Sequence, residues 1–308
     1  MHSSIRTALA LSILLPVNAS LALAQPEPVH PLLVDAAWLA ENHHRPDVVI
    51  VNVARDTAAF RQGQLPDARL LPVGDILVER NGVPNLLPEP EALEATFRGL
   101  GIESGDHVVL YGDMGGLAPA RAFVTLDYLG HERVSLLDGG LDGWRAAGGR
   151  TLLGEAPSVG EGDFRARVRS ERVVDAAWVR ERLGDPSVAL IDARPADYYH
   201  GREQGSMARA GHIPGAENRF WQEDFDGNGR LLGDAELAAR YAKAGASSDR
   251  TVVLYCGTGV QASHAYFVAR HLGYEDVRIY DGSMAEWGGL PPEAYPVVAG
   301  ADRGDDRR

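Results

Sequence analysis

Short apolar runs alternate with amphipathic segments over most of the chain, and this alternation predicts a fold class. In the C-terminal half, runs typical of buried parallel strands lie at 188–193, 251–255 and 277–280. Apolar positions at helical spacing lie at 175–183, 235–244 and 259–272. Strands that alternate with helices predict an α/β fold in which a doubly wound parallel sheet carries helices on both faces. Ligands of such folds bind beyond the carboxyl ends of the strands.

The pattern occurs twice. The sequence VDAAW stands at 34–38 and again at 174–178, and GHERVSLLDGGLDGW at 130–144 corresponds to GYEDVRIYDGSMAEW at 273–287. Because order and spacing persist through both halves, the sequence predicts a duplicated domain. The expected segments are a first domain at 30–147, a linker rich in glycine, proline and charge at 148–170, a second domain at 171–298 and a disordered tail at 299–308.

The first residues have the pattern of an export signal. Arg6 precedes an apolar core at 8–15, and the small residues Ala22 and Ala24 stand before the expected cleavage point. The apolar core is too short to anchor the chain in a bilayer. We therefore expect a signal peptide at 1–24, a periplasmic or secreted mature protein, and no membrane anchor.

Composition narrows the class of partner. The chain has 308 residues, 24% of them charged, and a formal net charge of −13, which argues against nucleic acid as a partner. Any anionic substrate must therefore be drawn by a local basic pocket. Residues 224–230 imitate the start of a calcium loop, but Ala235 stands at the twelfth position, where glutamate is needed. We expect no metal, no cofactor and a monomer.

Cys256 is the only cysteine of the chain, so an intramolecular disulfide is excluded. It stands between a predicted strand and a predicted helix, where free backbone N–H groups and the helix dipole favour the thiolate form. Cys256 is therefore predicted to be a nucleophile, the alternative being a structural cysteine at a strand end. The expected cradle for an anion on its sulfur is the loop of Gly257, Thr258, Gly259, Val260 and Gln261.

Four motifs together resemble the catalytic half of a tandem rhodanese-type sulfurtransferase. They are CGTGVQAS at 256–263, LIDARPADYY at 190–199, GHIPGA at 211–216 and YDGSMAEWG at 280–288. The resemblance covers 30–298 and implies two tandem rhodanese-like domains. It also implies that a small anionic sulfur donor, thiosulfate or 3-mercaptopyruvate, loads a persulfide onto Cys256, from which cyanide or a thiol takes the sulfur. Gly112 stands where the first copy would have its cysteine, so the first domain is expected to be catalytically silent.

The choice of donor stays open at this point. Arg194 matches the family's substrate-binding arginine and is predicted to hold a carboxylate or sulfonate by a forked contact, the alternative being a pair with Asp192. Arg202 is predicted as the second substrate arginine, with Arg209 as the alternative. The Gly-Thr-Gly loop is similar to that of mercaptopyruvate-preferring members. Gln64, however, stands where those members have a histidine of a proton relay, and glutamine cannot shuttle a proton.

Three further residues are expected to be structural. His212, in the GHIPGA motif, is expected to fix a turn near a strand end, and Trp144 and Trp287 occupy equivalent repeat positions as core or cleft-wall aromatics. Three functions then remain as hypotheses for the chain: an exported sulfurtransferase, a persulfide carrier that delivers sulfur to another exported protein, and a redox-sensing or interacting relic.

Overall fold

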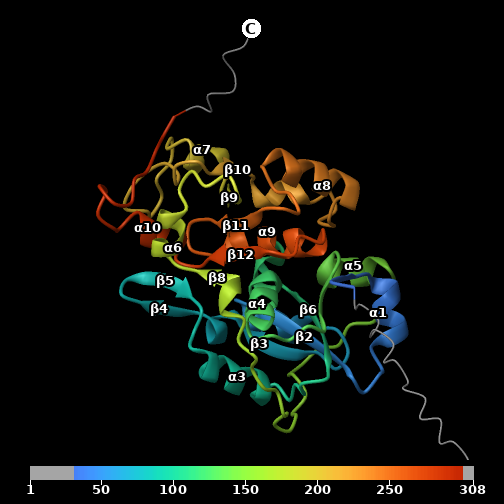
Figure 1. The fold of residues 1–308 in the computed structure, drawn as a ribbon. Helices are drawn as coiled ribbons and strands as arrows, with labels where there is room; N and C mark the ends of the chain where they lie inside the picture. The colour runs from blue at the N-terminus through green and yellow to red at the C-terminus, as the bar shows by residue number, and fades with distance from the viewer. Residues whose placement is uncertain (1–30, 301–308) are drawn as a thin grey trace, which may run out of the picture.

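The computed structural model describes residues 31–300, in which the two halves of the chain form two similar domains. The predicted signal peptide at 1–24 and most of the predicted tail lie outside the described residues. In Figure 1 the first domain, in blue and green, lies below the second, in yellow to red. Within residues 31–300, no helix is both long and apolar enough to cross a bilayer.

Each domain is built on a five-stranded parallel sheet, and the two sheets have the same topology. The first has the order β1-β7-β6-β2-β3, formed by β1 (Leu33–Val34), β2 (Val48–Ala54), β3 (Arg69–Pro72), β6 (His107–Gly112) and β7 (Val134–Leu137). The second has the order β8-β12-β11-β9-β10, formed by β8 (Val173–Val174), β9 (Val188–Asp192), β10 (Glu217–Asn218), β11 (Thr251–Tyr255) and β12 (Val277–Tyr280). The central strands β6 and β11 are buried along most of their length, and both contain the run Val-Val-Leu-Tyr, which is typical of strands covered on both faces.

Helices cover both faces of each sheet. Those of the first domain are α1 (Ala36–Asn42), α2 (Thr57–Gln62), α3 (Pro90–Gly99), α4 (Leu117–Tyr128) and α5 (Gly140–Ala146). Those of the second are α6 (Ala176–Glu181), α7 (Ala196–Tyr199), α8 (Asp234–Lys243), α9 (Val260–His271) and α10 (Ser283–Trp287). The repeated VDAAW motif begins α1 and α6 in the same way, since the side chains of Asp35 and Asp175 each accept a hydrogen bond from the backbone N–H three residues on, at 2.8 Å.

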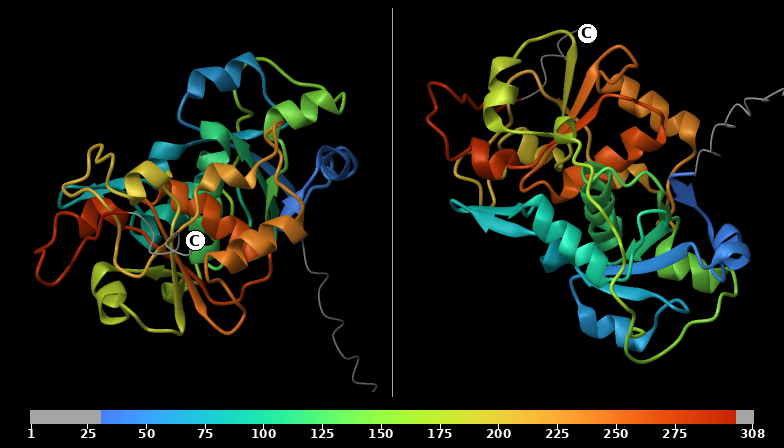
Figure 2. Two further views of the ribbon diagram at one scale, coloured as in Figure 1. Left: turned by 90° about the horizontal axis from the view of Figure 1, so that it is seen from above. Right: turned by 60° about the horizontal axis from the view of Figure 1, so that its bottom comes forward.

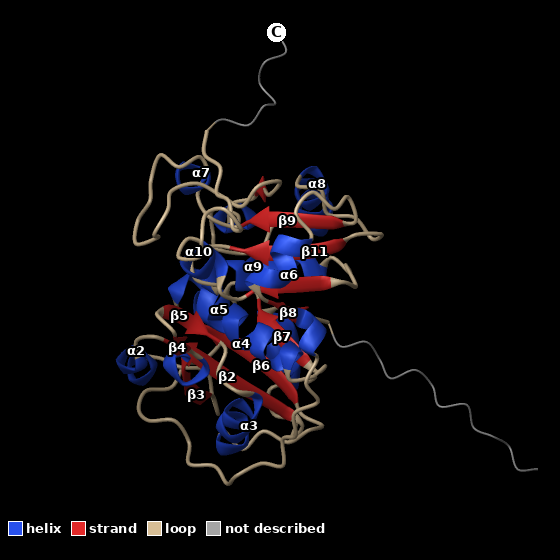
Figure 3. Ribbon diagram, turned by 60° about the vertical axis from the view of Figure 1, so that its left-hand side comes forward, coloured by secondary structure: helices blue, strands red, loops and turns tan. Residues whose placement is uncertain are grey.

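The two domains share one continuous core, which runs through α4 and α9. Both helices lie between the sheets in Figure 3 and are almost wholly buried. The rings of Phe123 on α4 and Phe267 on α9 meet edge to face with centroids 5.0 Å apart. The interface is therefore a packed hydrophobic layer that fixes the two domains relative to each other.

One hairpin of the first domain extends to the second domain. It consists of the antiparallel strands β4 (Val78–Arg80) and β5 (Val83–Leu86), and Figures 1 and 2 show it beside β8 and α10. The linker at 148–170 does not hang free between the domains but packs on the first one. Its Leu152 pairs with Gln64 through two backbone hydrogen bonds, and its Phe164 is buried in the core.

The predicted elements agree closely with the observed ones in the second domain. The predicted strands at 251–255 and 277–280 have the bounds of β11 and β12, and the one at 188–193 is one residue longer than β9. The predicted helices extend one or two residues beyond α6 and α9 at both ends, and the one at 235–244 is shifted by one residue from α8. Trp144 and Trp287 are core residues as predicted, and each indole N–H donates to a carbonyl, of Arg150 and Pro296 respectively.

Candidate active site

Cys256 lies between the carboxyl end of β11 and the first turn of α9, as predicted. The backbone N–H groups of Thr258, Gln261 and Ala262 lie near its sulfur and act to lower the pKa of the thiol. Gly259 is the N-cap of α9 with φ of 81°, a left-handed conformation that favours glycine. The loop is thus an amide cradle around the sulfur. Ala262, at the start of the helix, contributes to it although the predicted cradle ended at Gln261.

Cys256 is buried, with 1% of its surface exposed, and this corrects the prediction that the free thiolate is favoured. Burial raises the pKa of the Cys256 thiol, and the carboxylate of Asp192 adds to the rise. The three amides lower the pKa, but they offset only part of the cost of desolvation. The resting cysteine is therefore a buried, protonated thiol. The amides stabilise a negative charge only after the sulfur has lost its proton or become a persulfide.

The turn between β12 and α10 fixes the backbone of Cys256 from the side opposite the loop. The hydroxyl of Ser283 accepts a hydrogen bond from Cys256 N–H at 3.1 Å and donates to the carbonyl of Tyr280 at 2.9 Å. The N–H of Met284 donates to the Cys256 carbonyl at 3.1 Å. Ser283 has φ of 50°, an uncommon conformation for a residue with a side chain. The YDGSMAEWG motif is thus the backbone support of the cysteine.

The hairpin of the first domain holds the cysteine loop from across the interface. The side-chain amide of Asn85, on β5, donates to the hydroxyl of Thr258 at 3.0 Å. The backbone N–H of Leu87 donates to the carboxylate of Asp281 at 2.7 Å. The predicted catalytic loop is therefore completed by residues of the silent domain, which sequence reasoning did not single out.

A buried arginine from the first domain lies behind the same loop. Arg121, on α4, has no exposed surface, pairs with Asp281 at 2.7 Å and donates to the carbonyl of Asn85 at 2.6 Å. Its guanidinium also lies next to Gly259, where a Cβ would stand 3.4 Å from the Arg121 Nη1 atom and 2.8 Å from the Asp281 carbonyl oxygen. Position 259 therefore requires glycine for two reasons, its φ angle and this close packing.

Arg194 is buried and pairs with Asp192, which was the predicted alternative to a contact with the donor. Its guanidinium forms a forked contact with the Asp192 carboxylate, with Nη2 at 2.6 Å, and Nη2 also donates to the carbonyl of Gly211 at 2.7 Å. Burial alone would lower the pKa of Arg194, but Asp192, with smaller contributions from Tyr255 and Cys256, raises the pKa overall. The fork that was predicted to hold the donor thus binds Asp192, while the guanidinium remains within electrostatic reach of the sulfur.

The two candidates for the second substrate arginine make their hydrogen bonds to residues outside the cysteine loop. Arg202 is more than half exposed and pairs with Asp197 on the surface. Arg209 donates to the backbone carbonyls of Trp287, Gly288 and Leu290. The residue of this segment that reaches the loop is Met207, whose Cε lies 3.9 Å from the position of a Cβ at Gly257. The structure thus gives neither arginine a contact with the loop, and it places an apolar side chain beside it.

Gln64 and His212 occupy equivalent places in the two copies. The side-chain amide of Gln64 donates to the linker carbonyl of Gly154 at 3.1 Å. His212 is held by the carbonyl of Tyr199 at 2.7 Å and stacks on that tyrosine's ring, with centroids 3.6 Å apart. His212 is therefore structural as predicted. The Gln64 side chain thus serves to hold the linker on the first domain.

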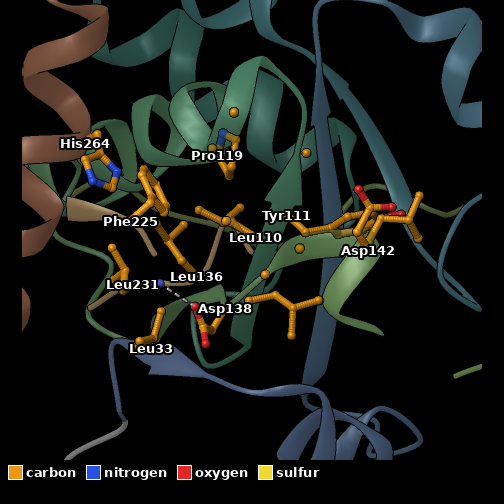
Figure 4. A pocket seen from close by; sticks show the side chains of 18 of the residues that line it. Leu33, Leu110, Tyr111, Pro119, Leu136, Asp138, Asp142, Phe225, Leu231 and His264 are labelled. Carbon is orange, nitrogen blue, oxygen red and sulfur yellow. Dashed lines mark hydrogen bonds between the residues drawn. The ribbon is translucent and has the colours of Figure 1, made fainter. Parts of the chain in front are cut away.

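The loop that begins at Gly112 in the first domain, called the silent loop, corresponds to the cysteine loop of the second domain. It differs from the cysteine loop by more than a missing thiol. A Cβ at Gly112 would stand 1.9 Å from the Val53 carbonyl oxygen, so no side chain fits without movement of the backbone. Next to Gly112, between the carboxyl ends of β6 and β7 and the second domain, lies a cavity of about 840 Å³, shown in Figure 4. Cys256 does not line it.

Comparison with known proteins agrees with this architecture. The rhodanese-like domain model matches residues 35–147 and again 175–290. A thiosulfate sulfurtransferase of Azotobacter vinelandii is 32% identical over 85% of this chain and 95% of its own length. The sulfur carrier protein TtuD of Thermus thermophilus is 32% identical over 89% of this chain and 99% of its own. The crystal structure of SseA from Escherichia coli, a 3-mercaptopyruvate sulfotransferase, matches 82% of this chain and 98% of that one with 30% identity and a TM-score of 0.74.

The chain therefore belongs to the rhodanese-like family, with two tandem domains. It is an enzyme of the sulfurtransferase class.

Proposed function

We propose that the chain moves a sulfane sulfur from thiosulfate or 3-mercaptopyruvate to cyanide or a thiol through a persulfide on Cys256. The observation that carries the proposal is the place of Cys256 in a glycine-bearing loop between the carboxyl end of the central strand and the start of α9, where three backbone N–H groups act to lower the pKa of its thiol. Such a cradle stabilises an anion without a counter-charge, and both the thiolate and the persulfide are anions. The relatives named for these two donors support the choice of substrate class.

The proposed reaction has two displacement steps. The Cys256 thiolate attacks the outer sulfur of thiosulfate, the S–S bond of the donor breaks with its electron pair on sulfite, and Cys256 becomes a persulfide. With 3-mercaptopyruvate the C–S bond breaks instead, and the carbon that keeps the electron pair takes a proton to give pyruvate. In the second step cyanide or a thiolate attacks the outer sulfur, and the S–S bond breaks with its electron pair on Cys256. Cyanide becomes thiocyanate, a thiolate becomes a new persulfide, and the Cys256 thiolate is restored.

The amides act at both steps, because they bind the charge wherever it resides on the sulfur pair. Thr258, Gln261 and Ala262 are fixed by the helix start, so their N–H groups need no reorganisation when the charge appears. Since burial raises the pKa of Cys256, the first step also requires transfer of the thiol proton to water that enters with the donor. We propose that the donor reaches the sulfur after displacement of the Met207 side chain, which lies beside the loop.

Steady-state assays test this function directly. Purified protein is expected to release sulfite from thiosulfate with cyanide, or pyruvate from 3-mercaptopyruvate with a thiol, and a folded Cys256→Ser variant is expected to do neither. Both donors should be compared on one preparation, because the ratio of their kcat/KM values gives the donor preference. Absence of turnover with both donors, from protein whose Cys256 accepts alkylating reagents, contradicts the proposal.

A persulfide carrier is the second candidate, and one observation favours it. Cys256 is 1% exposed, so a persulfide formed there is shielded from thiols in solution, and a relative is named as a sulfur carrier. A carrier keeps one sulfur on Cys256 through a desalting step and releases it only to a protein acceptor. An enzyme with small acceptors gives many turnovers instead.

We propose in addition that the mature chain is exported to the periplasm or secreted, and acts as a monomer. The apolar core at 8–15 and the small residues before position 25 support export. Amino-terminal sequencing of the protein recovered from the periplasmic fraction or the medium tests this. A start near Gln25 supports cleavage, whereas an intact amino terminus in the cytosol contradicts it.

A further inference from the structure

The cavity beside Gly112 lies where folds of this kind bind ligands, but in the domain that has no catalytic cysteine. It opens at the carboxyl ends of β6 and β7. Its remaining walls come from β1, α4 and α5 of the first domain and from the segment 221–231 and α9 of the second. Open α/β sheets bind ligands at this edge. The volume of about 840 Å³ is within the range of small-molecule sites.

One wall of the cavity is apolar. Figure 4 shows the side chains of Leu33, Leu110 and Leu136 from the first domain facing Phe225 and Leu231 from the second. Trp221 packs against the silent loop, with a ring atom 3.4 Å from the position of a Cβ at Gly115. An occupant of this space must therefore have an apolar or aromatic body.

The charged groups that line the cavity are mostly acidic. Among residues 31–300, four carboxylates line it, against one guanidinium, that of Arg145. The lining imidazole of His264 adds no positive charge at neutral pH, because burial and Arg219 lower its pKa to about 3. The four carboxylates belong to Asp113, Asp138, Asp142 and Asp226.

Two of these carboxylates have basic partners, which reduces their charge. Asp142 pairs with Arg145 at 3.3 Å, and Asp138 pairs with Arg230 at 3.0 Å. These two pairs make the rim of the cavity approximately neutral, so the sign of the field inside depends on the remaining carboxylates.

Asp113 and Asp226 are held by neutral N–H groups. One oxygen of Asp113 accepts from the backbone N–H groups of Arg55 and Asp56, and its other oxygen is buried with no hydrogen-bond partner among the described residues. Asp226 accepts from the backbone N–H groups of Asn228 and Arg230, and these hold its pKa below the ordinary value, with a smaller contribution from the charge of Arg230. Neither carboxylate forms a salt bridge within residues 31–300, and one acceptor oxygen of Asp113 lacks a donor.

We propose that this cavity is a second ligand site, which binds a compact organic cation with an apolar or aromatic body. The leucine and phenylalanine wall takes the body, and the carboxylates of Asp113 and Asp226 attract the charge. The sulfur donors of the proposed reaction are anions and are repelled by the same carboxylates. The cavity therefore does not serve as an entrance for them, and this site does not depend on the function proposed for Cys256.

Calorimetric titration of the full chain with three matched compounds tests the proposal. Phenethylamine, 2-phenylethanol and phenylacetate share a ring and a two-carbon chain or its analogue, and they carry a positive charge, no charge and a negative charge. We expect phenethylamine to bind about tenfold more tightly than 2-phenylethanol, and phenylacetate more weakly than both. Equal affinities for the amine and the alcohol, or no heat from the amine at millimolar concentration, overturn the proposal.

Variants separate this cavity from other sites. Asp113→Asn keeps an acceptor for the two backbone N–H groups but removes the charge, and it is expected to reduce the preference for the amine to about threefold or less. Leu231→Trp, at a half-buried loop position, fills the space and is expected to abolish binding. Asp197→Asn, on the surface beside Arg202, is the matched control and leaves binding unchanged.

Two controls separate loss of binding at the cavity from misfolding and from binding at the cysteine loop. Circular dichroism and the thermal midpoint establish that the Leu231→Trp variant is folded, and unchanged amine binding in that folded variant overturns the proposal. Cys256→Ser is expected to bind phenethylamine as the wild type does. Loss of binding in that variant would place the cation at the cysteine loop and also overturn the proposal, whatever the sulfur assays show.

Discussion

The guanidinium of Arg121, on α4 of the first domain, lies 2.7 Å from the carboxylate of Asp281, directly behind the cysteine loop of the second domain. Both side chains are buried, and the other oxygen of Asp281 accepts the N–H of Leu87. In the first copy the equivalent Asp138 accepts the N–H of Leu231 from the second domain. The interface is therefore pseudo-symmetric, and each domain contributes a loop that closes the strand ends of the other.

Removal of Arg121 tests the importance of this pair. Arg121→Ala leaves the Asp281 charge buried without its partner, and we expect a loss of about 3–5 kcal/mol in the free energy of unfolding, with loss of turnover. Urea unfolding measures the first effect. Arg230→Ala removes the half-exposed counterpart that pairs with Asp138 and is expected to cost less than about 1 kcal/mol. Equal losses in the free energy of unfolding for the two variants would contradict the importance given to the buried pair of Arg121 and Asp281.

The contact from Asn85 to Thr258 tests whether the silent domain positions the loop. Asn85 has φ of 61°, so Asn85→Gly preserves the backbone while removing the amide that donates to Thr258. We expect a fall of about fivefold to tenfold in kcat, for one neutral hydrogen bond, with a smaller change in thermal midpoint. Asn81→Gly, at φ of 55° in the same hairpin, is the matched control. A similar fall in both variants points to the hairpin as a whole rather than to the contact.

Gly112 tests why the first domain is silent. A Cβ at this position would stand 1.9 Å from a backbone oxygen of Val53, so Gly112→Cys is expected to destabilise the protein by about 2 kcal/mol or more and to create no second persulfide. Gly105→Ala meets no atom within 4 Å and serves as control. Intact mass after incubation with donor reports the number of sulfur atoms gained. Two added sulfurs in a stable Gly112→Cys variant contradict this explanation.

Alkylation of the single cysteine measures the protection of the thiol. Because burial raises the pKa of Cys256, iodoacetamide is expected to react with the native protein more slowly than with urea-unfolded protein, and with a midpoint at higher pH. Met207→Ala removes the side chain beside Gly257 and is expected to speed native alkylation about threefold to tenfold without a shift of that midpoint. A native midpoint at or below that of the unfolded chain contradicts the protonated resting state.

Acid stability follows from a histidine distant from the site. Burial lowers the pKa of His131 to about 4 from its ordinary value of 6.5. In that window the unfolded chain binds a proton that the folded chain does not, so the free energy of unfolding falls as the pH drops from 6.5 to about 4. His131→Gln is expected to flatten this part of the profile, as measured by urea unfolding at the two ends of the window. An unchanged dependence of the free energy of unfolding on pH in this variant would contradict the role given to His131.

The sequence was sufficient for the fold because the signals that define it are local. Central strands such as 251–255 are uninterrupted β-branched runs, and the internal repeat doubles the evidence for each element. The position of Cys256 between strand and helix followed from the same pattern. Glycines at 257 and 259 then predicted an amide loop, which the structure shows.

The parts that could not be predicted depend on contacts between segments far apart in the chain. The protonation of Cys256 is set by how deeply the other elements bury it, which the strand-to-helix position does not reveal. Arg121 and Asn85 carry no motif, since their role exists only because the two domains pack together. Asp281 did have a signal: it stands in the repeated Asp-Gly turn, where its counterpart Asp138 is also an interface residue.

The substrate arginines show the same limit. Arg194 follows a strand end in a recognisable motif, yet the carboxylate two residues before it takes the forked contact. Arg202 and Arg209 lie in a segment without secondary structure, and its course alone decides that Met207 faces the loop. Spacing along the chain cannot distinguish these neighbours, because a loop has no fixed side-chain period.

Intact-protein mass spectrometry after incubation with each donor tests the central claim most directly. The account predicts a gain of one sulfur atom that maps to the Cys256 peptide, disappears on addition of cyanide with release of thiocyanate, and is absent from Cys256→Ser. A Cys256→Ser variant that still transfers sulfur at the wild-type rate, or a wild-type protein that turns over without ever carrying the added sulfur, would contradict it.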